Sequence, residues 1–385
     1  MTSLTYVLTK YVQPTQTFVT GEIAELRRIG VAVQVITIGH GEVAPPAEEG
    51  VLVLADLQPG WPQLLSAHAY AAVRRPLGYV RFLVDVGRMR REMGRLPEQV
   101  PWTLLPGVAR RVEGQALHAH FAWSGAAAAL LLAHLTGLRW SVTLHANDIF
   151  SRQRNLRRKL RAADRLITVC DYNREWLRTH LGLTRAVDVV VCGVVVPAEP
   201  WPRVQGADVV AVGRLVEKKG LDVLVRAAAE VEELTVDIIG EGRQREALEV
   251  LVAQLGLEGR VRLLGARPHD ETLARIAGAK AFCLPARVAG DGDRDSMPVV
   301  IKEAMARRVP VVASQVVAIP EMLGDGCGLM VPPDDAPALA LALKQVLADP
   351  GAMRAMTERA RARVEENFTL AGETARLKDL LLGRR

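Results

Sequence analysis

The sequence predicts an α/β protein of two domains, each built on a parallel sheet with helices on its faces. Short apolar runs alternate with amphipathic helical patterns, which is the order of strands joined by helical crossovers. The alternation stops at residues 197–208, a segment with the composition of a linker, and then begins again. A chain of 385 residues is also too long for one ordinary core. These observations predict two Rossmann-like domains that face one another across a cleft, a geometry suited to one ligand in each domain.

The first domain is expected at residues 1–199. It opens with a buried strand at residues 4–8, followed by a polar loop and a helical pattern that Gly30 ends. The further strands are expected at residues 31–38, 117–121, 140–144, 165–169 and 187–191. The helices are expected at residues 18–29, 126–135 and 173–180.

The second domain is expected at residues 200–365, and a C-terminal helix at residues 366–385 is expected to pack back on the first domain. Its strands are expected at residues 208–212, 235–239, 261–264, 281–284 and 309–313. Its helices are expected at residues 222–230, 243–255, 271–278 and 299–307. Pro298 suits the start of the last of these helices, where a missing N–H costs nothing.

Two arginine-rich segments, residues 62–96 and 152–165, are also predicted to be mainly helical. In the first, apolar positions such as Leu77 and Val80 are interleaved with the arginines. A solvated helical face explains this pattern, and so does a surface that binds an anionic membrane. The longest apolar run, residues 125–135, is too short to span a bilayer, so any membrane contact is expected to be peripheral.

Composition narrows the class of protein. Hydrophobic residues make up 49% of the chain and charged residues 24%, which excludes global disorder. A net charge of +6 is compatible with phosphates, nucleotides or an anionic membrane, but it singles out none of them. The four cysteines are far apart and the chain opens with a strand rather than a secretory signal. We therefore expect a cytoplasmic protein, with the inner face of the plasma membrane as a peripheral site.

The loop VGRLVEKKGLD, residues 212–222, follows the first strand of the second domain. Gly213 permits close backbone approach, and Arg214 and Lys219 bring two cations to the carboxyl end of a strand. A fork of arginine donors and a lysine point charge suit a diphosphate. A charged surface turn is the alternative.

Two further motifs follow in the same domain. IIGEG, residues 238–242, places Gly240, Glu241 and Gly242 in a tight loop after a strand, a common pattern that is weak by itself. DSMPVVIKEAMA joins Asp295, just outside a helix N-terminus, to Glu303 inside the helix. Glu303 lies among apolar residues and needs a partner, which is either a pair of ligand hydroxyls or a buried cation.

In order and spacing, VGRLVEKKG, IIGEG and DSMPVVIKEAMA resemble the retaining glycosyltransferases of family four, which have the two-domain GT-B fold. The N-terminal stretches YVLTKYVQPTQTFVTGEI, HAHF and TLHANDIF resemble the branch that builds exopolysaccharides and capsules, of the colanic-acid type. The resemblance implies a hexosyltransferase whose donor is a nucleotide-diphosphate sugar and whose acceptor is a glycan or a lipid-linked glycan. No metal cofactor and no nucleic acid are expected.

The resemblance also implies roles for individual residues. Arg214 and Lys219 match the cations that bind the donor's diphosphate and stabilise the leaving phosphate. Glu303 matches the glutamate that binds the ribose, while Asp295 and His145 match residues next to the donor sugar. The glycine-rich loop of residues 240–242 matches one that lies along the nucleotide.

Three positions depart from the family pattern. Asp295 replaces the family's first glutamate and is one methylene shorter. Ser296 replaces the glycine that follows it, and Gln16 replaces an acidic residue of this branch. Because of these departures, a nucleotide-sugar-binding protein without turnover is one alternative. A retaining glycoside phosphorylase is another, because the same fold and phosphate-binding cations can run the reaction with inorganic phosphate.

Two groups of residues resemble metal ligands but are not expected to bind a metal. Asp291 and Asp293 form a DGD sequence, but the cations and a helix end can neutralise a diphosphate without a metal. His118 and His120 point to the same side of a strand, and two histidines without a third ligand are more often packed or hydrogen-bonded.

Overall fold

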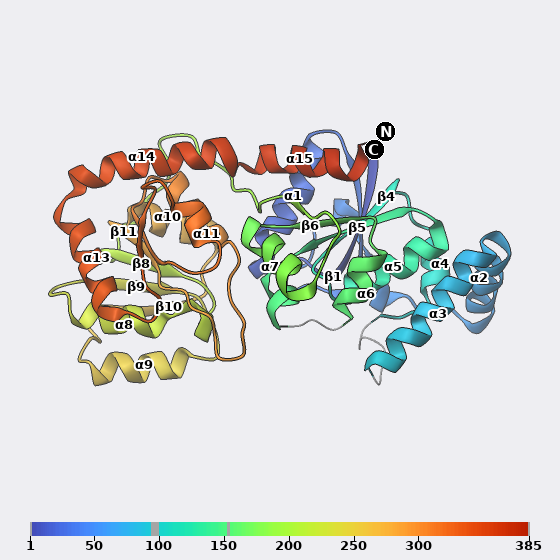
Figure 1. Cartoon of the computed structure of the whole chain (residues 1–385), viewed down its shortest axis with the longest axis horizontal. Coiled ribbons are helices and arrows are strands. Elements are labelled where there is room, and N and C mark those ends of the chain that lie inside the picture. Colours follow the sequence, from blue (N-terminus) through green and yellow to red (C-terminus); the bar gives the residue numbers. More distant parts are fainter. Residues whose placement is uncertain (1, 94–99, 152–154, 384–385) are drawn as a thin grey trace. The chain divides into compact units, whose positions relative to one another are not determined.

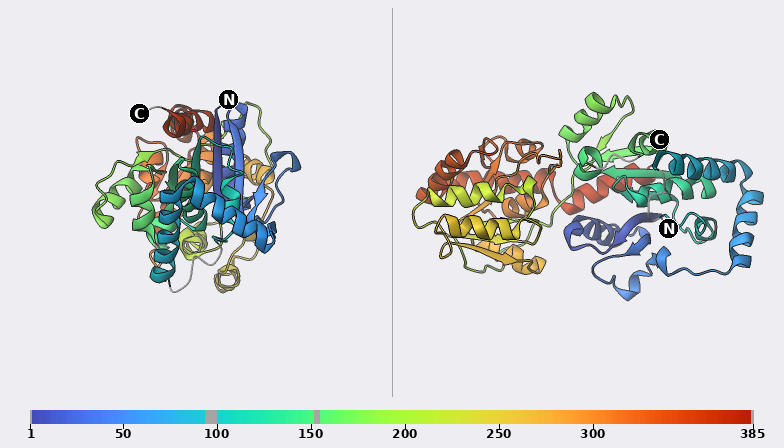
Figure 2. Two further views of the ribbon diagram at one scale, coloured as in Figure 1. Left: turned by 90° about the vertical axis from the view of Figure 1, so that its right-hand side faces the viewer. Right: turned by 90° about the horizontal axis from the view of Figure 1, so that it is seen from below.

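The computed structural model describes residues 2–93, 100–151 and 155–383, and it divides the chain into two compact units. The first unit comprises Met1–Val169, Asn173–Val190 and Glu373–Arg385, and the second comprises Cys170–Tyr172 and Val191–Gly372. Each unit contains one parallel sheet flanked by helices (Figures 1 and 2). The prediction of two α/β domains with parallel sheets is therefore confirmed.

The sheet of the first unit has the strand order β3-β2-β1-β4-β5-β6-β7, and every neighbouring pair is parallel. Its strands are β1 (Ser3–Tyr11), β2 (Ala32–His40), β3 (Leu52–Val53), β4 (Ala116–His120), β5 (Arg139–Leu144), β6 (Arg165–Thr168) and β7 (Asp188–Val189). Its helices are α1 (Thr17–Arg28), α2 (Trp61–Arg74), α3 (Pro76–Met93), α4 (Leu105–Ala109), α5 (Ser124–Thr136), α6 (Leu156–Ala162) and α7 (Asp171–Leu181). The order reverses between β1 and β4, which makes their carboxyl ends a topological switch point.

The sheet of the second unit has the order β10-β9-β8-β11-β12-β13, again with parallel neighbours. Its strands are β8 (Val209–Val212), β9 (Val236–Ile239), β10 (Val261–Gly265), β11 (Ala281–Leu284), β12 (Val311–Ser314) and β13 (Leu329–Val331). Its helices are α8 (Leu221–Ala229), α9 (Arg245–Gln254), α10 (His269–Gly278), α11 (Val299–Ala306), α12 (Ile319–Leu323), α13 (Ala336–Ala348) and α14 (Pro350–Asn367). Here the order reverses between β8 and β11, so the loops after these two strands border the switch point.

Of the two arginine-rich segments, the first is mostly helical as predicted, and the second is less helical than predicted. The helical segment predicted at residues 62–96 is two helices, α2 and α3, because Arg75 before Pro76 leaves the helical region of the backbone. In the part of residues 152–165 that the structure describes, α6 is the one helix, since Ala163 is extended. Residues 94–96 and 152–154 of these predictions lie outside the described residues.

A final helix, α15 (Leu370–Leu382), supplies apolar residues to the core of the first unit. Leu377 and Leu381 are buried in the same hydrophobic cluster as Leu4 and Tyr6 of β1 and Ile23 of α1. Burial of such side chains stabilises a core by about 1.5–3 kcal/mol each. The first unit is thus completed by a segment that is far from it in the sequence.

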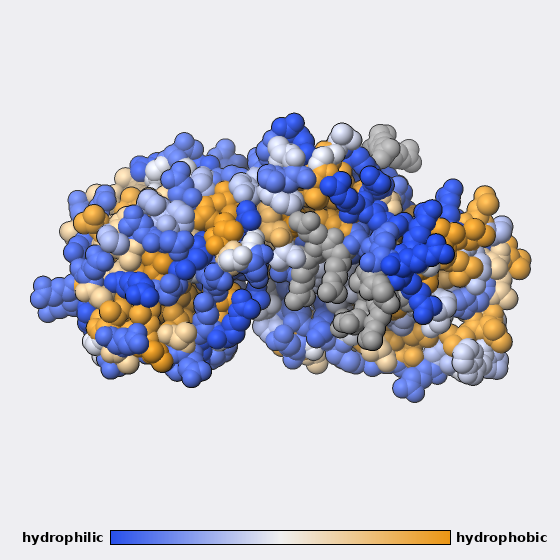
Figure 3. Space-filling view, turned by 60° about the horizontal axis from the view of Figure 1, so that its bottom comes forward, coloured by the Kyte–Doolittle hydropathy of each residue, from blue (hydrophilic) through white to orange (hydrophobic). Residues whose placement is uncertain are grey.

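The outer surface of α2 and α3 is unusually apolar. Large side chains lie exposed along both helices, and Val73 and Leu77 at their junction are 85% and 76% exposed. The other members are Trp61, Leu65, Tyr70, Val80, Leu83 and Val84. Figure 3 shows apolar residues, in orange, among hydrophilic ones at the right-hand end of the first unit, where these helices lie. We call this set the α2–α3 surface.

Candidate functional site

Two loops of the second unit, which follow the neighbouring strands β8 and β9, are joined through their backbones. The N–H of Gly213 donates to the carbonyl of Ile239, and the N–H of Leu215 donates to the carbonyl of Glu241. A side chain at Gly240 would lie 2.0 Å from the Gly213 oxygen, and one at Gly242 would lie 2.4 Å from the Leu215 oxygen. Glycine is therefore required at residues 240 and 242 of IIGEG because the backbone there lies in close contact with the loop after β8. Their predicted place along a nucleotide stays a prediction.

Glu241, between these glycines, faces outward. Its carboxylate accepts a hydrogen bond from the guanidinium of Arg245 at 3.0 Å and is half exposed. Since surface ion pairs of this kind contribute little to stability, the side chain is available to a ligand at small cost.

The two predicted cations of the loop after β8 differ in their surroundings. Arg214 is exposed, and its guanidinium has no hydrogen bond or ion pair with any residue that the structure describes. Lys219 extends past Gly213, where a Cβ would lie 3.0 Å from its Cε atom. Its ammonium contacts Asp295 at 2.5 Å. Arg214 thus offers a free fork of donors, whereas Lys219 already has a carboxylate.

Asp295, which was predicted to contact a sugar, is paired with two lysines. Its second oxygen lies 3.3 Å from Lys218, a largely buried lysine that also contacts Asp293 at 3.1 Å. Burial alone would raise the pKa of Asp295, but the charges of Lys219 and Lys218 lower it to about 2. The carboxylate is therefore ionised and neutralises the cation that was predicted to bind a diphosphate. The role of Lys218 was missed, because nothing in the repeated lysines of EKKG shows which one is buried.

The negative charge of Glu303, on α11, is compensated by nearby cations much less than that of Asp295. Its side chain is 14% exposed, and its one ion-pair partner among the described residues is His269, at 3.5 Å. Burial raises the pKa of Glu303, although the charges of His269, Arg307 and Lys302 oppose this. Of the two sequence-based alternatives, a tightly paired buried carboxylate does not fit this geometry. A carboxylate with unused acceptor capacity fits a ligand with hydroxyl groups.

The remaining predicted residue, His145, follows β5 in the first unit. Asp148 is fully buried and links the loop after β5 to the loop after β4, because it accepts the N–H of His145 at 2.9 Å and the N–H of Ala122 at 2.7 Å. Burial raises the pKa of Asp148 to about 7, although backbone hydrogen bonds and Lys159 lower it in part. The carboxylate of Asp148 therefore fixes the backbone at His145 to the loop that follows the neighbouring strand β4.

The imidazole of His145 belongs to a buried polar cluster that the sequence did not predict. Its Nε2 lies 3.1 Å from Nδ1 of His120, and Nε2 of His120 lies 2.8 Å from the carboxylate of Glu22 on α1. Glu22 also accepts the hydroxyl of Tyr6 at 2.6 Å. The one available signal was the position of Glu22 a helical turn after Phe18, in the stretch that carries the family resemblance.

A cavity of about 130 Å³ borders this cluster at the carboxyl ends of β1 and β4. It is lined by Leu8, Thr9, Lys10, Gln13, Gln16, His120, Phe121 and Trp123. Gln16, where the family branch has an acidic residue, is among them. Phe121 has a left-handed backbone (φ 64°) and its ring lies 4.3 Å from that of His145. A non-glycine residue in this conformation is uncommon and is concentrated at functional sites.

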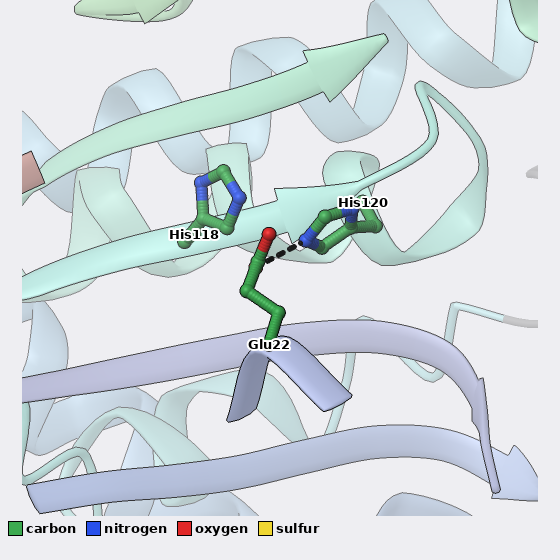
Figure 4. A group of neighbouring side chains, drawn as sticks. All are labelled: Glu22, His118 and His120. Atoms are coloured by element: carbon green, nitrogen blue, oxygen red, sulfur yellow. Dashed lines mark hydrogen bonds and ion pairs between the residues drawn. The ribbon is translucent and has the colours of Figure 1, made fainter. Parts of the chain in front are cut away.

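Neither candidate metal group needs a metal to satisfy its polar atoms. Among the described residues, Glu22, His118 and His120 form a group of three side chains with the proximity of metal ligands (Figure 4). However, His118 is occupied by Ser141 at 2.8 Å and Thr143 at 3.3 Å. In the DGD sequence, Asp293 contacts Lys218, and Asp291 accepts the N–H of Asp293 at 2.9 Å.

Comparison with known proteins matches both halves of the chain to family models. Residues 15–196 match the model for "Glycosyltransferase Family 4", and residues 201–363 match the model for "Glycosyl transferases group 1". Together the two models account for most of the chain.

Curated relatives agree with these models. The chain is 37% identical, over 169 residues, to a putative colanic acid biosynthesis glycosyltransferase, WcaL, of Escherichia coli. The aligned residues are 42% of this chain and 41% of that protein. It is also 36% identical, over 183 residues, to a GDP-mannose-dependent mannosyltransferase of Mycolicibacterium smegmatis that is named for phosphatidylinositol monomannoside. The aligned residues are 46% of this chain and 48% of that protein. The chain therefore matches less than half the length of either relative.

Among solved structures, HepE of Anabaena in complex with UDP-glucose has a TM-score of 0.72 and is 17% identical to the chain, with 99% of each chain covered. At this identity the likeness is one of fold, and it extends over both units.

Proposed function

Since the chain belongs to the glycosyltransferases described by these two family models, we propose that it transfers a sugar from a nucleotide-diphosphate donor to a hydroxyl of a glycan or lipid-linked acceptor. The relative named for colanic acid biosynthesis supports a role in polysaccharide biosynthesis. The observation that carries the proposal is a pair of polar side chains in the second unit. The guanidinium of Arg214, in the loop after β8, is exposed, and the carboxylate of Glu303, on α11, has little compensation for its charge.

In this proposal the second unit binds the nucleotide. The exposed fork of Arg214 donates to the diphosphate, and Lys219 exchanges part of its contact with Asp295 for a phosphate oxygen. Glu303 accepts from the ribose hydroxyls, which gives its buried carboxylate the donors that it lacks. No metal is required, because these two cations compensate the charge that develops on the leaving phosphate.

Retention of configuration is proposed from the family resemblance. Because no side chain of the described residues stands out as a nucleophile, we favour attack of the acceptor hydroxyl on the face from which the diphosphate leaves. The hydroxyl proton passes to the departing phosphate as the new glycosidic bond forms. His145 donates a hydrogen bond to a sugar hydroxyl in this scheme.

We further propose that the α2–α3 surface binds the inner face of an anionic membrane, where a lipid-linked acceptor would be found. Within the described residues, no helix has the length and apolar composition that a bilayer crossing requires. The exposed apolar side chains of α2 and α3 are accompanied by arginines such as Arg81 and Arg88. Apolar insertion combined with basic residues is the usual chemistry of peripheral binding to anionic lipids.

The test is a panel of UDP and GDP sugars, scored first by thermal shift and then by product analysis. A specific donor should raise the melting temperature by mass action, and transfer should release a nucleoside diphosphate. Formation of a sugar phosphate without nucleotide would instead identify a phosphorylase, and binding without turnover would identify a nucleotide-sugar-binding protein.

The matched variants are Arg214→Gln and Arg226→Gln. Both arginines are exposed, but Arg226 lies in the last turn of α8. Loss of a charge-assisted contact of about 1.5–3 kcal/mol should weaken nucleoside diphosphate binding about 10- to 150-fold in the first variant only. Equal affinity in both variants would exclude the assigned role of Arg214.

A further inference from the structure

Glu22, His120 and His145 form a continuous hydrogen-bonded chain through the interior of the first unit. The chain joins three elements, since Glu22 lies on α1, His120 ends β4 and His145 follows β5. Both imidazoles are buried, with 2% of His120 and 7% of His145 exposed. Polar side chains buried to this degree are held by defined hydrogen bonds, so the positions of their protons can be deduced.

The first proton is fixed by Glu22. An ionised carboxylate only accepts hydrogen bonds, and the carboxylate of Glu22 receives the Tyr6 hydroxyl at 2.6 Å and His120 Nε2 at 2.8 Å. Nε2 of His120 must therefore carry hydrogen (Figure 4). If His120 carries a second proton on Nδ1, the pair is an ion pair, which compensates the charge of Glu22 in its largely buried place.

The second proton then determines the state of His145. Nδ1 of His120 and Nε2 of His145 lie 3.1 Å apart, so a single proton is shared between these two nitrogens. When His120 is the charged partner of Glu22, that proton belongs to His120, and Nε2 of His145 accepts it in a hydrogen bond. Burial lowers the pKa of His145 well below its usual range, and the positive charge of His120 lowers it further. His145 is thus neutral at pH 7, and with the shared proton on His120 its own single proton is on Nδ1. That nitrogen has no hydrogen-bond partner among the described residues.

We propose that Glu22 and His120 are positioning residues that hold His145 in the Nδ1–H tautomer, so that it donates a hydrogen bond to a hydroxyl of the sugar substrate. The assignment of that hydroxyl rests on the proposed glycosyltransferase function, whereas the tautomer itself does not. A histidine with one nitrogen fixed by a neighbour presents a defined group at the other, which is how an orienting partner acts in many polar sites.

The packing around His145 supports a fixed orientation rather than a mobile ring. Phe18 lies on it with ring centroids 5.0 Å apart, and Phe121 lies at 4.3 Å. Phe121 reaches this position through its left-handed backbone, which costs about 1–3 kcal/mol and persists only where the surroundings demand it. The polar cavity bordered by Phe121 and His120 gives a small hydrogen-bonding ligand access to the same region.

A metal ion bound by Glu22, His118 and His120 is the competing explanation of this cluster. It would have to displace Tyr6 or His120 from Glu22, and Ser141 or Thr143 from His118. Four satisfied hydrogen bonds in a buried place are thus better explained by a hydrogen-bonded relay than by a ligand set.

The test is the protonation state of the ring nitrogens, measured by long-range ¹⁵N–¹H correlation spectra of protein labelled in its eight histidines. His145→Gln assigns the signal, and no substrate is needed. In the unsubstituted protein the proton should be on Nδ1 of His145. A proton on Nε2, or a stoichiometric metal found by elemental analysis, would overturn the proposal, and neither result would bear on the glycosyltransferase function.

Glu22→Gln then tests the role of the carboxylate, with Glu25→Gln as the matched control on the same helix. The amide preserves the shape of Glu22 but removes its charge, so the hydrogen bond between the two rings should reverse and the proton of His145 should move to Nε2. With the donor found by the panel above, kcat/KM should fall about 10- to 100-fold in Glu22→Gln, the loss expected from misdirecting one hydrogen bond of a charged network. Glu25→Gln should change neither the tautomer nor kcat/KM. An unchanged tautomer in Glu22→Gln would refute the role of Glu22, even if His145→Gln abolished transfer.

Discussion

Replacement of Asp295 by asparagine should affect stability and ligand binding in opposite directions. Asp295 is paired with Lys219 at 2.5 Å and with Lys218 at 3.3 Å, and these lysines lower its pKa to about 2 from an ordinary value of 3.8. This difference corresponds to about 2 kcal/mol of stabilisation at neutral pH. Asp295→Asn removes it and leaves Lys218 in its buried place with Asp293 as a partner.

The pH dependence has a definite sign. Because the pKa of Asp295 is lower in the folded protein than in the unfolded chain, its stabilisation is present above pH 3.8 and is lost as the pH falls through about 2. Urea unfolding should therefore show Asp295→Asn about 2 kcal/mol less stable than the unsubstituted protein from pH 8 to pH 5. The difference should shrink below about pH 4.

Binding should change in the other direction. Lys219 is released from its carboxylate in Asp295→Asn, so UDP or GDP should raise the melting temperature of the variant more than that of the unsubstituted protein. Asp291→Asn is the control, since Asp291 is an exposed acid of the same loop and, from the described part of the chain, accepts only the backbone N–H of Asp293. Equal stability of Asp295→Asn and the unsubstituted protein at pH 7, or a difference that is as large at pH 3 as at pH 7, would refute the assigned ion pairs.

Three further outcomes are expected. Glu303→Gln should lower nucleoside diphosphate affinity about tenfold or more by calorimetry, with no loss of stability in urea, because burial of this carboxylate is poorly compensated. Leu77→Glu should abolish co-sedimentation with anionic vesicles, because it places a negative charge on the exposed α2–α3 surface. The same substitution should change the free energy of unfolding by less than about 0.5 kcal/mol. Vesicle binding by the unsubstituted protein should weaken as the salt concentration rises. Gly242→Ala should cost about 1–3 kcal/mol in urea unfolding because its Cβ would lie 2.4 Å from the Leu215 oxygen, whereas Gly259→Ala, with open space around it, should be nearly neutral.

The alternation of strands and helices was readable from the sequence because buried parallel strands are continuous apolar runs. The short edge strands β3 and β13 were missed, since two or three half-buried residues give no such run. The break between α2 and α3 was missed although Pro76 signalled it, because the apolar pattern continues on both sides of the proline.

The candidate site was predictable only as a set of loops. Gly213, Arg214 and Lys219 follow β8 as expected, since position after a strand is a local property of the sequence. The pairing of Lys219 with Asp295 joins residues 76 positions apart, and that of His120 with Glu22 joins residues 98 positions apart. No local pattern specifies such partners, because they are fixed by the order of strands in the sheet and the side-chain packing on it.

The place of α15 in the first unit has a consequence for how the protein is made. Leu377 and Leu381 of α15 cover a core that includes Leu4 of β1. The ribosome nevertheless synthesises the whole second unit after the main part of the first unit and before α15 is complete. At about 5–20 residues per second, a ribosome needs roughly ten seconds or more to deliver the second unit. During that interval the nascent first unit exposes the apolar surface that α15 will later cover. Its final folding step therefore has to follow translation of the second unit, and chaperones have a defined surface to protect until then.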